Sequence, residues 1–498
     1  ISGLLVVTKC APEEEFRPLM IHGRPRGGFV PLPTRNETYA QQELGIIVAD
    51  WFVNRVNHFS DYPDVYNQRY WYYDQWYRTG GPAFLMLGGE GAQDPFWLQY
   101  EDLEWIQLAK QHGAMLFLLE HRYYGQSRPT PDMSTTNLWT LSSAQAIEDT
   151  AAFIIGMKAK FPQLANVPWV TFGGSYAGAL AAWARIRRPD VVAMAVGSSG
   201  PVQAQVDFKE YLVVVENAIT RESPQCAQSV TTAFNLVASM LQTASGRQSL
   251  KTTFNLCQDL IPADVNQIEY FWQNVYIPYM QVVQYSGDNA GLYANELTIK
   301  NAICRFHETQ DNSLTKLREV NNYVHQMLGS NGCMYVDYWN LVKYLQDTRY
   351  GQAQEYRAWT WQCCTEFGYF QSTDSDTAGP FFGGKSALPV QHSIDECTHI
   401  FGSDLNSATI AAHVAHINDY YGGRNMDSSY IILPNGNIDP WHALGKLNST
   451  ISTIVPVVID GAAHCADMYP STPNDSPSMT EARKLIATTL QQWLQSPK

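Results

Sequence analysis

A serine set between two glycines and a helical run is the residue best placed to act as a nucleophile. Ser175 follows the apolar, β-prone run 167–172 and then Gly173 and Gly174. A strand, a tight turn and a helix, with the serine on the turn, form a nucleophile elbow, which lifts the hydroxyl clear of the sheet. The strict pattern G-x-S-x-G fails by one methyl group, because Ala177 replaces the last glycine. We therefore predict a nucleophilic Ser175 from its local context.

Two further residues could complete the chemistry that this serine needs. A serine hydroxyl is a weak nucleophile, so it requires a general base, and the base requires an orienting acid. Asp439 follows the predicted strand 430–433, and His464 follows the predicted strand 454–459. The chain order Ser, Asp, His is the order found in hydrolases that use a nucleophile elbow. We predict Asp439 as the orienting acid and His464 as the base.

Five nearby side chains could compete for these roles. His442 could act as the base only if its own loop folds back. Asp460 and Asp467 flank the predicted base and could replace the orienting acid. Ser198 and Ser199 also follow a predicted strand, but no helix begins behind them, which favours ordinary loop serines.

Negative charge that develops on a substrate oxygen needs two aimed hydrogen-bond donors. The backbone N–H of Tyr176 and that of Gly89, in the glycine-rich loop 88–91, are the predicted pair. Glu90 is unusual in such a loop. It could bind a substrate ammonium group, but pairing with an arginine such as Arg122 is the favoured interpretation.

The remaining candidates concern binding. Trp441 and other aromatic residues near the site belong to the core or form the wall of an apolar specificity pocket. His413 and His416 have the spacing of a metal pair on a helix, but no third ligand accompanies them. We predict no metal and no cofactor.

The elements that must position these residues alternate between strand and helix from residue 83 to residue 200, which indicates a parallel sheet with helices on both faces. The region after Pro201 is rich in helices and cysteines, and the strands resume at Tyr430. The predicted plan is a signal remnant and a pro-segment or extended arm over 1–45, a first sheet segment over 46–205, an inserted helical domain over 206–422, and a second sheet segment over 423–498. A capping box at Ser478 predicts the start of the last helix.

Composition narrows the classes of partner. The 498 residues carry a net charge of −14, which disfavours binding to nucleic acid or to anionic membranes. Nine cysteines and the sequons at Asn36, Asn448 and Asn474 favour an oxidising secretory route. Without Cys10, eight cysteines allow four disulfides. A homodimer stays open beside a monomer.

Several separated motifs together resemble the S28 serine peptidases, the family of lysosomal Pro-Xaa carboxypeptidase, dipeptidyl peptidase II and thymus-specific serine protease. They are Gly173 to Gly178, Glu120 to Gly125, Asn67 to Tyr70, Asn435-Gly436 with Asp439-Pro440-Trp441, and His464. The resemblance runs from about residue 48 to the C-terminus. It implies an α/β-hydrolase fold with an inserted helical cap, a Ser175–Asp439–His464 triad, no metal, an acid pH optimum, and proline or a small residue on the acyl side of the cut bond.

Two departures from the prolyl-cleaving members resemble the thymus-specific branch. Those members have methionine four residues after the serine, where this chain has Ala179, and a second histidine after the catalytic one, where it has Cys465. The proline preference therefore depends mainly on Trp441.

The predicted function is that of a secreted or lysosomal serine exopeptidase acting on short peptides, as a carboxypeptidase or a dipeptidyl peptidase. An esterase or lipase on the same fold is the alternative enzyme. A catalytically silent hydrolase-fold protein that only binds its partners is the alternative from another class.

Overall fold

An eight-stranded sheet forms the centre of the computed structural model, which describes residues 16–28, 47–287, 294–330 and 332–496. Its strand order is β12-β11-β8-β7-β5-β6-β4-β3. Only β3 and β4 run antiparallel to their neighbours, at one edge. This order and orientation, with the elbow after β7, confirm the predicted α/β-hydrolase fold. The strands are β3 Val48–Arg55, β4 Val65–Tyr73, β5 Ala83–Leu87, β6 Met115–Leu119, β7 Trp169–Gly174, β8 Met194–Ser198, β11 Ile431–Gly436 and β12 Ile454–Ile459.

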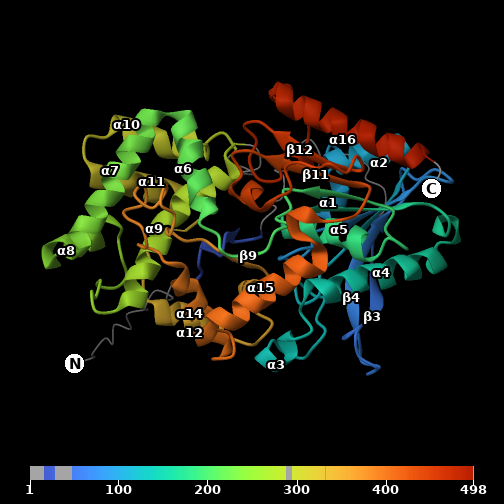
Figure 1. The fold of residues 1–498 in the computed structure, drawn as a ribbon, viewed down its shortest axis with the longest axis horizontal. Coiled ribbons are helices and arrows are strands. Elements are labelled where there is room, and N and C mark those ends of the chain that lie inside the picture. The colour runs from blue at the N-terminus through green and yellow to red at the C-terminus, as the bar shows by residue number, and fades with distance from the viewer. Residues whose placement is uncertain (1–15, 29–46, 288–293, 331, 497–498) are drawn as a thin grey trace, which may run out of the picture.

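Helices cover both faces of this sheet (Figure 1). The central strands β5, β6, β7 and β8 are buried along their whole length, which is why they read as continuous apolar runs. Trp169 belongs to the core on one face and the next residue, Val170, to the core on the other. Helices α4 Ser143–Lys160 and α5 Tyr176–Arg187 pack on the first face, and α2 Glu104–His112 and α16 Pro477–Gln495 on the second. The short helices α1 Phe96–Gln99 and α3 Thr135–Leu138 complete this part.

Ten helices lie between β8 and β11 in the described part of the chain, and we call them the insertion. They are α6 Glu210–Glu222, α7 Pro224–Leu241, α8 Ala244–Thr253, α9 Val265–Tyr285, α10 Arg305–Thr309, α11 Ser313–Met327, α12 Tyr338–Leu345, α13 Gln354–Gln362, α14 Val390–Phe401 and α15 Ser407–Tyr421. Two π-helical segments, η4 Ile299–Cys304 and η5 Cys363–Phe367, and a parallel pair of short strands, β9 Gln205–Asp207 and β10 Gly368–Phe370, accompany them. The insertion interrupts the sheet between two neighbouring strands, β8 and β11.

Residues 16–28 form a small hairpin, in the region where the sequence predicts a pro-segment or an extended arm. Its strands are β1 Met20–Ile21 and β2 Arg24–Pro25. Figure 1 shows the hairpin in blue near the middle of the molecule, between the insertion and the sheet. The residues from Leu19 to Pro25 are all buried. The predicted signal remnant lies outside the described residues.

Two predictions on the frame of the molecule need correction. The last helix is capped by Ser476, whose side chain accepts the backbone N–H of Met479, because Pro477 begins the helix one residue before the predicted cap Ser478. The described residues hold three disulfides rather than four. They join Cys226 to Cys304, Cys257 to Cys333 and Cys364 to Cys397. Cys363 and Cys465 are free thiols, and both are buried.

Candidate active site

The elbow places Ser175 in a conformation that few residues adopt. Its φ of 60° and ψ of −130° put it outside the usual regions for a non-glycine residue, and its backbone N–H donates to the carbonyl of Ser198 at 2.9 Å. Glycines allow the close approach around it. A Cβ on Gly173 would lie 2.1 Å from the carbonyl oxygen of Ala177, and one on Gly178 would lie 2.6 Å from that of Ser198.

The alanine that breaks the strict motif fits because it faces another glycine. The methyl group of Ala177 points toward Gly89. A Cβ added to Gly89 would lie 3.2 Å from that methyl group. The loop 88–91 therefore lies against the first turn of α5. The alanine at position 177, in place of the motif glycine, therefore does not separate the helix from this loop.

Asp439 and His464 form a buried hydrogen-bonded pair. The Nδ1–H of His464 donates to Oδ2 of Asp439 at 2.8 Å, and both side chains are fully buried. The other carboxylate oxygen accepts the backbone N–H of Trp441 at 2.9 Å, which fixes the aspartate at the start of η7 Pro440–Leu444. Because Nδ1 carries the proton toward the carboxylate, Nε2 is the basic nitrogen of the ring.

Backbone hydrogen bonds tie the histidine loop to the elbow. The carbonyl of Ser198 accepts the N–H of Ser175, and the Oγ of Ser199 accepts the N–H of Cys465 at 2.9 Å. Two consecutive residues at the end of β8 thus hold Ser175 on one side and the residue after His464 on the other. Ser198 and Ser199 therefore connect the two loops through hydrogen bonds.

His442, Asp460 and Asp467 have different partners. The Nδ1 of His442 lies 2.6 Å from the backbone carbonyl oxygen of Asp439. Asp460 is exposed and pairs with Arg221 at 2.7 Å. Asp467 accepts the Oγ–H of Ser198 at 2.5 Å, and burial raises the pKa of its carboxyl. Of the three candidate carboxylates, Asp439 is the one that the structure brings into a hydrogen bond with His464.

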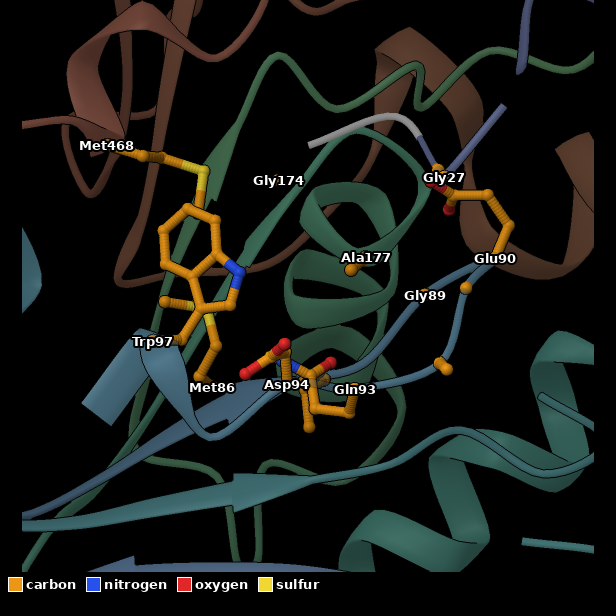
Figure 2. A pocket seen from close by; sticks show the side chains of 14 residues that line it. Gly27, Met86, Gly89, Glu90, Gln93, Asp94, Trp97, Gly174, Ala177 and Met468 are labelled. Atoms are coloured by element: carbon orange, nitrogen blue, oxygen red, sulfur yellow. The ribbon is translucent and has the colours of Figure 1, made fainter. Parts of the chain in front are cut away.

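A pocket of about 160 Å³ lies beside the elbow (Figure 2). The glycine-rich loop, Gly174 and Ala177 form one wall, and Met86, Trp97 and Met468 form the apolar opposite side. The loop that carries Gly89 and the helix N-terminus that carries Tyr176 therefore face one small cavity. This arrangement suits backbone donors to a developing oxyanion.

Sequence reasoning missed the network that holds the Tyr176 side chain. Its hydroxyl lies 3.0 Å from Nε2 of His121 and accepts from the amide of Gln362 at 3.0 Å. The Nδ1–H of His121 donates to the carbonyl of Arg122 at 2.8 Å, and burial lowers the pKa of this imidazole to about 4. The neutral ring therefore accepts, at Nε2, a hydrogen bond from the Tyr176 hydroxyl group. In the sequence, the run Glu120 to Gly125 supports only the family resemblance and does not indicate this hydrogen-bond network.

The predicted pairing of Glu90 with Arg122 is wrong. Arg122 is buried and binds Asp149 with two hydrogen bonds, from Nε at 2.6 Å and from a terminal nitrogen at 2.7 Å. Glu90 instead offers its backbone carbonyl to Nε of Arg24 at 2.6 Å. The arginine that reaches the glycine-rich loop 88–91 comes from the N-terminal hairpin.

The two other predicted pocket residues lie in different places. Trp441 is buried with its ring centroid 6.3 Å from that of His464, and its indole N–H donates to Gln284 of α9 at 3.0 Å. Ala179 is fully buried against the backbone of Gly200. A Cβ added to Gly200 would lie 2.7 Å from the backbone nitrogen of Ala179. Trp441 therefore stands next to the proposed base, and Ala179 belongs to the packing of α5.

The predicted sequons and the histidine pair can also be placed. Asn448 and Asn474 are exposed, whereas Asn36 lies outside the described residues. His413 contacts the carbonyl of Cys364 at 3.4 Å, and His416 stacks on Tyr420. Within the described ranges no three His, Cys, Asp or Glu side chains gather as a metal site would need, and no helix there combines the length and hydropathy of a membrane span.

Comparison with known proteins decides the family. The family described as "Serine carboxypeptidase S28" matches residues 54–486, most of the chain. The chain belongs to the S28 family of serine peptidases. A Caenorhabditis elegans protein named "Putative serine protease K12H4.7" is 55% identical to this S28 peptidase over 98% of the chain and 96% of its own length.

Two human S28 proteins are more distant relatives. Human thymus-specific serine protease is 34% identical, over 86% of this chain and 83% of its own length. Human lysosomal Pro-X carboxypeptidase is 27% identical, over 89% of this chain and 88% of its own. The higher identity to the thymus-specific protein agrees with the departures at Ala179 and Cys465.

Proposed function

We propose that this S28 peptidase is an exopeptidase whose catalytic residues are Ser175, Asp439 and His464. The observation that carries the proposal is the buried hydrogen bond from His464 Nδ1 to Asp439, at the sheet edge where the elbow ends. Parallel strands β7, β8, β11 and β12 bring these loops to one edge. A carboxylate-oriented imidazole beside an elbow serine is the arrangement that acyl transfer needs.

Each residue has one task in the proposed reaction. The Ser175 oxygen attacks the peptide carbonyl while Nε2 of His464 takes its proton, and the same nitrogen later gives that proton to the leaving amine. Asp439 holds the imidazole tautomer and stabilises the imidazolium. The backbone N–H groups of Tyr176 and Gly89 bind the oxyanion. Water then attacks the acyl group on Ser175, with His464 again taking and returning the proton, and the acyl product is released.

The proposed substrates are short peptides with proline or a small residue on the acyl side of the cut bond. The insertion supports the size limit, because α9 reaches the site through Gln284, whose carbonyl accepts the backbone N–H of His464 at 2.9 Å. Trp441 supports an apolar pocket, since proline packs well on an indole face. The three disulfides support a secreted or lysosomal location, where an acid pH would be the working condition.

The first test is covalent labelling of the serine. Ser175→Ala should abolish labelling by a fluorophosphonate probe and reduce peptide hydrolysis by about 10⁴-fold or more. Ser471→Ala, at an exposed serine, is the matched control and should behave as the wild type. Undiminished labelling or hydrolysis in Ser175→Ala would refute the proposed nucleophile.

A peptide panel at pH 5 and pH 7.5, read by mass spectrometry, tests the specificity. Release of a C-terminal residue after proline would show a carboxypeptidase, and release of an N-terminal dipeptide would show a dipeptidyl peptidase. Cleavage after alanine but not after proline would remove the proline preference. Turnover of lipid esters without peptide hydrolysis would favour an esterase or lipase, and no labelling at all would favour a silent binding protein.

A further inference from the structure

The proposed catalytic residues are covered in this structure. Ser175 is 1% exposed, and Asp439 and His464 are fully buried. A peptide carbonyl must come within contact distance of the serine oxygen before it can react. Some segment over the site therefore has to leave or move before a substrate can bind.

The turn of the N-terminal hairpin lies directly against the wall of the site. Gly23 has a φ of 72°, and a Cβ on it would lie only 2.5 Å from the indole ring of Trp441. Its carbonyl accepts the side-chain amide of Gln284 at 3.3 Å. Gln284 also bonds Trp441 and the backbone of His464. The turn thus packs on Trp441 and Gln284, and Gln284 bonds the backbone of the proposed base.

The same hairpin continues along the cleft to the oxyanion loop. Arg24 donates to the carbonyl of Glu90 at 2.6 Å and pairs with Glu355 of α13 at 2.5 Å. Gly27 and Gly28 line the pocket beside the elbow, and Figure 2 shows Gly27 next to Glu90. The hairpin therefore spans the distance between the proposed base and the proposed oxyanion hole.

On its other side the hairpin covers a buried acid of the insertion. The Nε2 of His22 lies 3.3 Å from Oε1 of Glu396, on α14, and both side chains are 1% exposed. Within the described residues, neither oxygen of this carboxylate accepts a hydrogen bond, and the His22 imidazole is the group within 4 Å that carries a positive charge when protonated. Aromatic residues stand around the pair, since Trp359 donates to the His22 carbonyl at 3.3 Å and the Phe370 ring lies 5.1 Å from the imidazole.

We propose that residues 16–28 occupy the peptide-binding cleft, and that Glu396 is a subsite for a positively charged group of the substrate once these residues have left. A buried carboxylate is unfavourable unless a cation compensates it, and here the group that can supply this charge, the His22 imidazole, belongs to the occupying hairpin. Departure of the hairpin exposes an unpaired acid between aromatic walls. Such a site suits a lysine or arginine side chain, or an amino terminus. The proposal rests on the proposed function for the identity of the reactive serine.

Removal of the hairpin tests the first part. A recognition sequence for a site-specific protease replaces residues 34–40 of the full chain, and loss of the hairpin after cleavage is followed by mass spectrometry. Fluorophosphonate labelling of Ser175 should become at least about 10-fold faster, because the fraction of open molecules rises. Synthetic peptide 16–28 added back should slow it again. Equal labelling rates before and after loss of the hairpin would overturn the proposal.

A point variant tests the same step without cleavage. Gly23→Ala introduces a methyl group into the Trp441 ring, whereas Gly402→Ala, also at a positive φ, meets no atom within 4 Å. Labelling of Ser175 should be faster in Gly23→Ala and unchanged in Gly402→Ala. The same rate in both variants would contradict the assigned position of the hairpin.

A binding cycle tests the acid subsite independently of catalysis. Cleaved, hairpin-free Ser175→Ala protein is titrated at pH 5 with fluorescent peptide 16–28 and with its His22→Ala form. The histidine should strengthen binding by about 10-fold, and this difference should vanish in Glu396→Gln but persist in the neighbouring control Asp395→Asn. A difference that survives in Glu396→Gln would overturn the subsite, whether or not Ser175 is the nucleophile.

Substrate arms then separate the two sources of positive charge. The cleaved enzyme receives paired peptides with lysine or norleucine at each position, each with a free or an acetylated amino terminus. Preference for lysine that is lost in Glu396→Gln assigns the subsite to a side chain, and preference for the free amine assigns it to the amino terminus. No dependence on either charge would refute the cationic subsite.

Discussion

At the scale of single residues, a substitution of Asp439, the proposed orienting acid, tests its role in catalysis. Asp439→Asn replaces the acceptor of the Nδ1 proton with an amide, which can select the wrong tautomer of His464. The rate of peptide hydrolysis should fall by about 10³–10⁴-fold with the fold intact. Asp460→Asn is the control, because this exposed aspartate only pairs with Arg221 at the surface, and its activity should be nearly unchanged. A small effect of Asp439→Asn on kcat would remove this aspartate from the triad.

Glu366 gives a prediction about stability rather than rate. Its carboxyl is buried against the start of α4, where it accepts the backbone N–H and the hydroxyl of Ser143, and burial raises its pKa to about 7. Between the ordinary glutamate pKa of about 4.3 and this value, the unfolded chain releases the proton while the folded chain keeps it. The free energy of unfolding should therefore fall by about 3 kcal/mol as the pH rises from 4.5 to 7.

Glu366→Gln should remove that part of the pH dependence, which urea unfolding at four pH values between 4.5 and 7.5 would measure. Glu319→Gln, at a partly exposed glutamate beside Arg318, should leave the pH profile as it is in the wild type. A Glu366→Gln profile as steep as that of the wild type would mean that the buried carboxyl is not the group that titrates.

At the scale of elements, the elbow depends on how closely α5 approaches β8. Gly178→Ala would place a methyl group 2.6 Å from the carbonyl of Ser198, so the helix must shift away from the strand. We expect a loss of about 1–3 kcal/mol in the free energy of unfolding and slower fluorophosphonate labelling. Gly351→Ala, with open space around it, should change neither quantity. Unaltered labelling in Gly178→Ala would show that the elbow tolerates this shift.

The sequence predicted elements well where local pattern and burial agree. The strand, turn and helix around Ser175 and the two late strands before Asp439 and His464 lie where the pattern indicated. The strand predicted before Ser198 covers Met194–Ser198 and so includes that serine, because Val191 and Val192 bond back to the carbonyl of Arg188 in a turn and the strand begins only after it. The hairpin was not predictable, since its partners Gln284, Glu396 and Trp441 are hundreds of residues away and no local pattern encodes them.

At the scale of the whole molecule, the disulfide between Cys226 and Cys304 should affect stability more than chemistry. Cys226 and Cys304 close a loop with a sequence separation of 78 residues inside the insertion. Replacing both by serine should lower the free energy of unfolding by about 4 kcal/mol, since the unfolded chain regains the entropy of an open loop. Denaturant unfolding measures this loss, and fluorophosphonate labelling of the folded protein should be retained. A matching loss of labelling would mean that this disulfide also shapes the site.

The interruption of the sheet by the insertion also sets the order in which the site can exist during synthesis. About 290 residues separate Ser175 from His464, and β11 and β12 leave the ribosome only after the whole insertion. At 5–20 residues per second, roughly 15–60 s pass between the synthesis of Ser175 and that of His464, the proposed base. For that interval the chain carries the proposed nucleophile without the proposed base, so we expect the nascent chain to be unable to cleave the polypeptides that are made beside it.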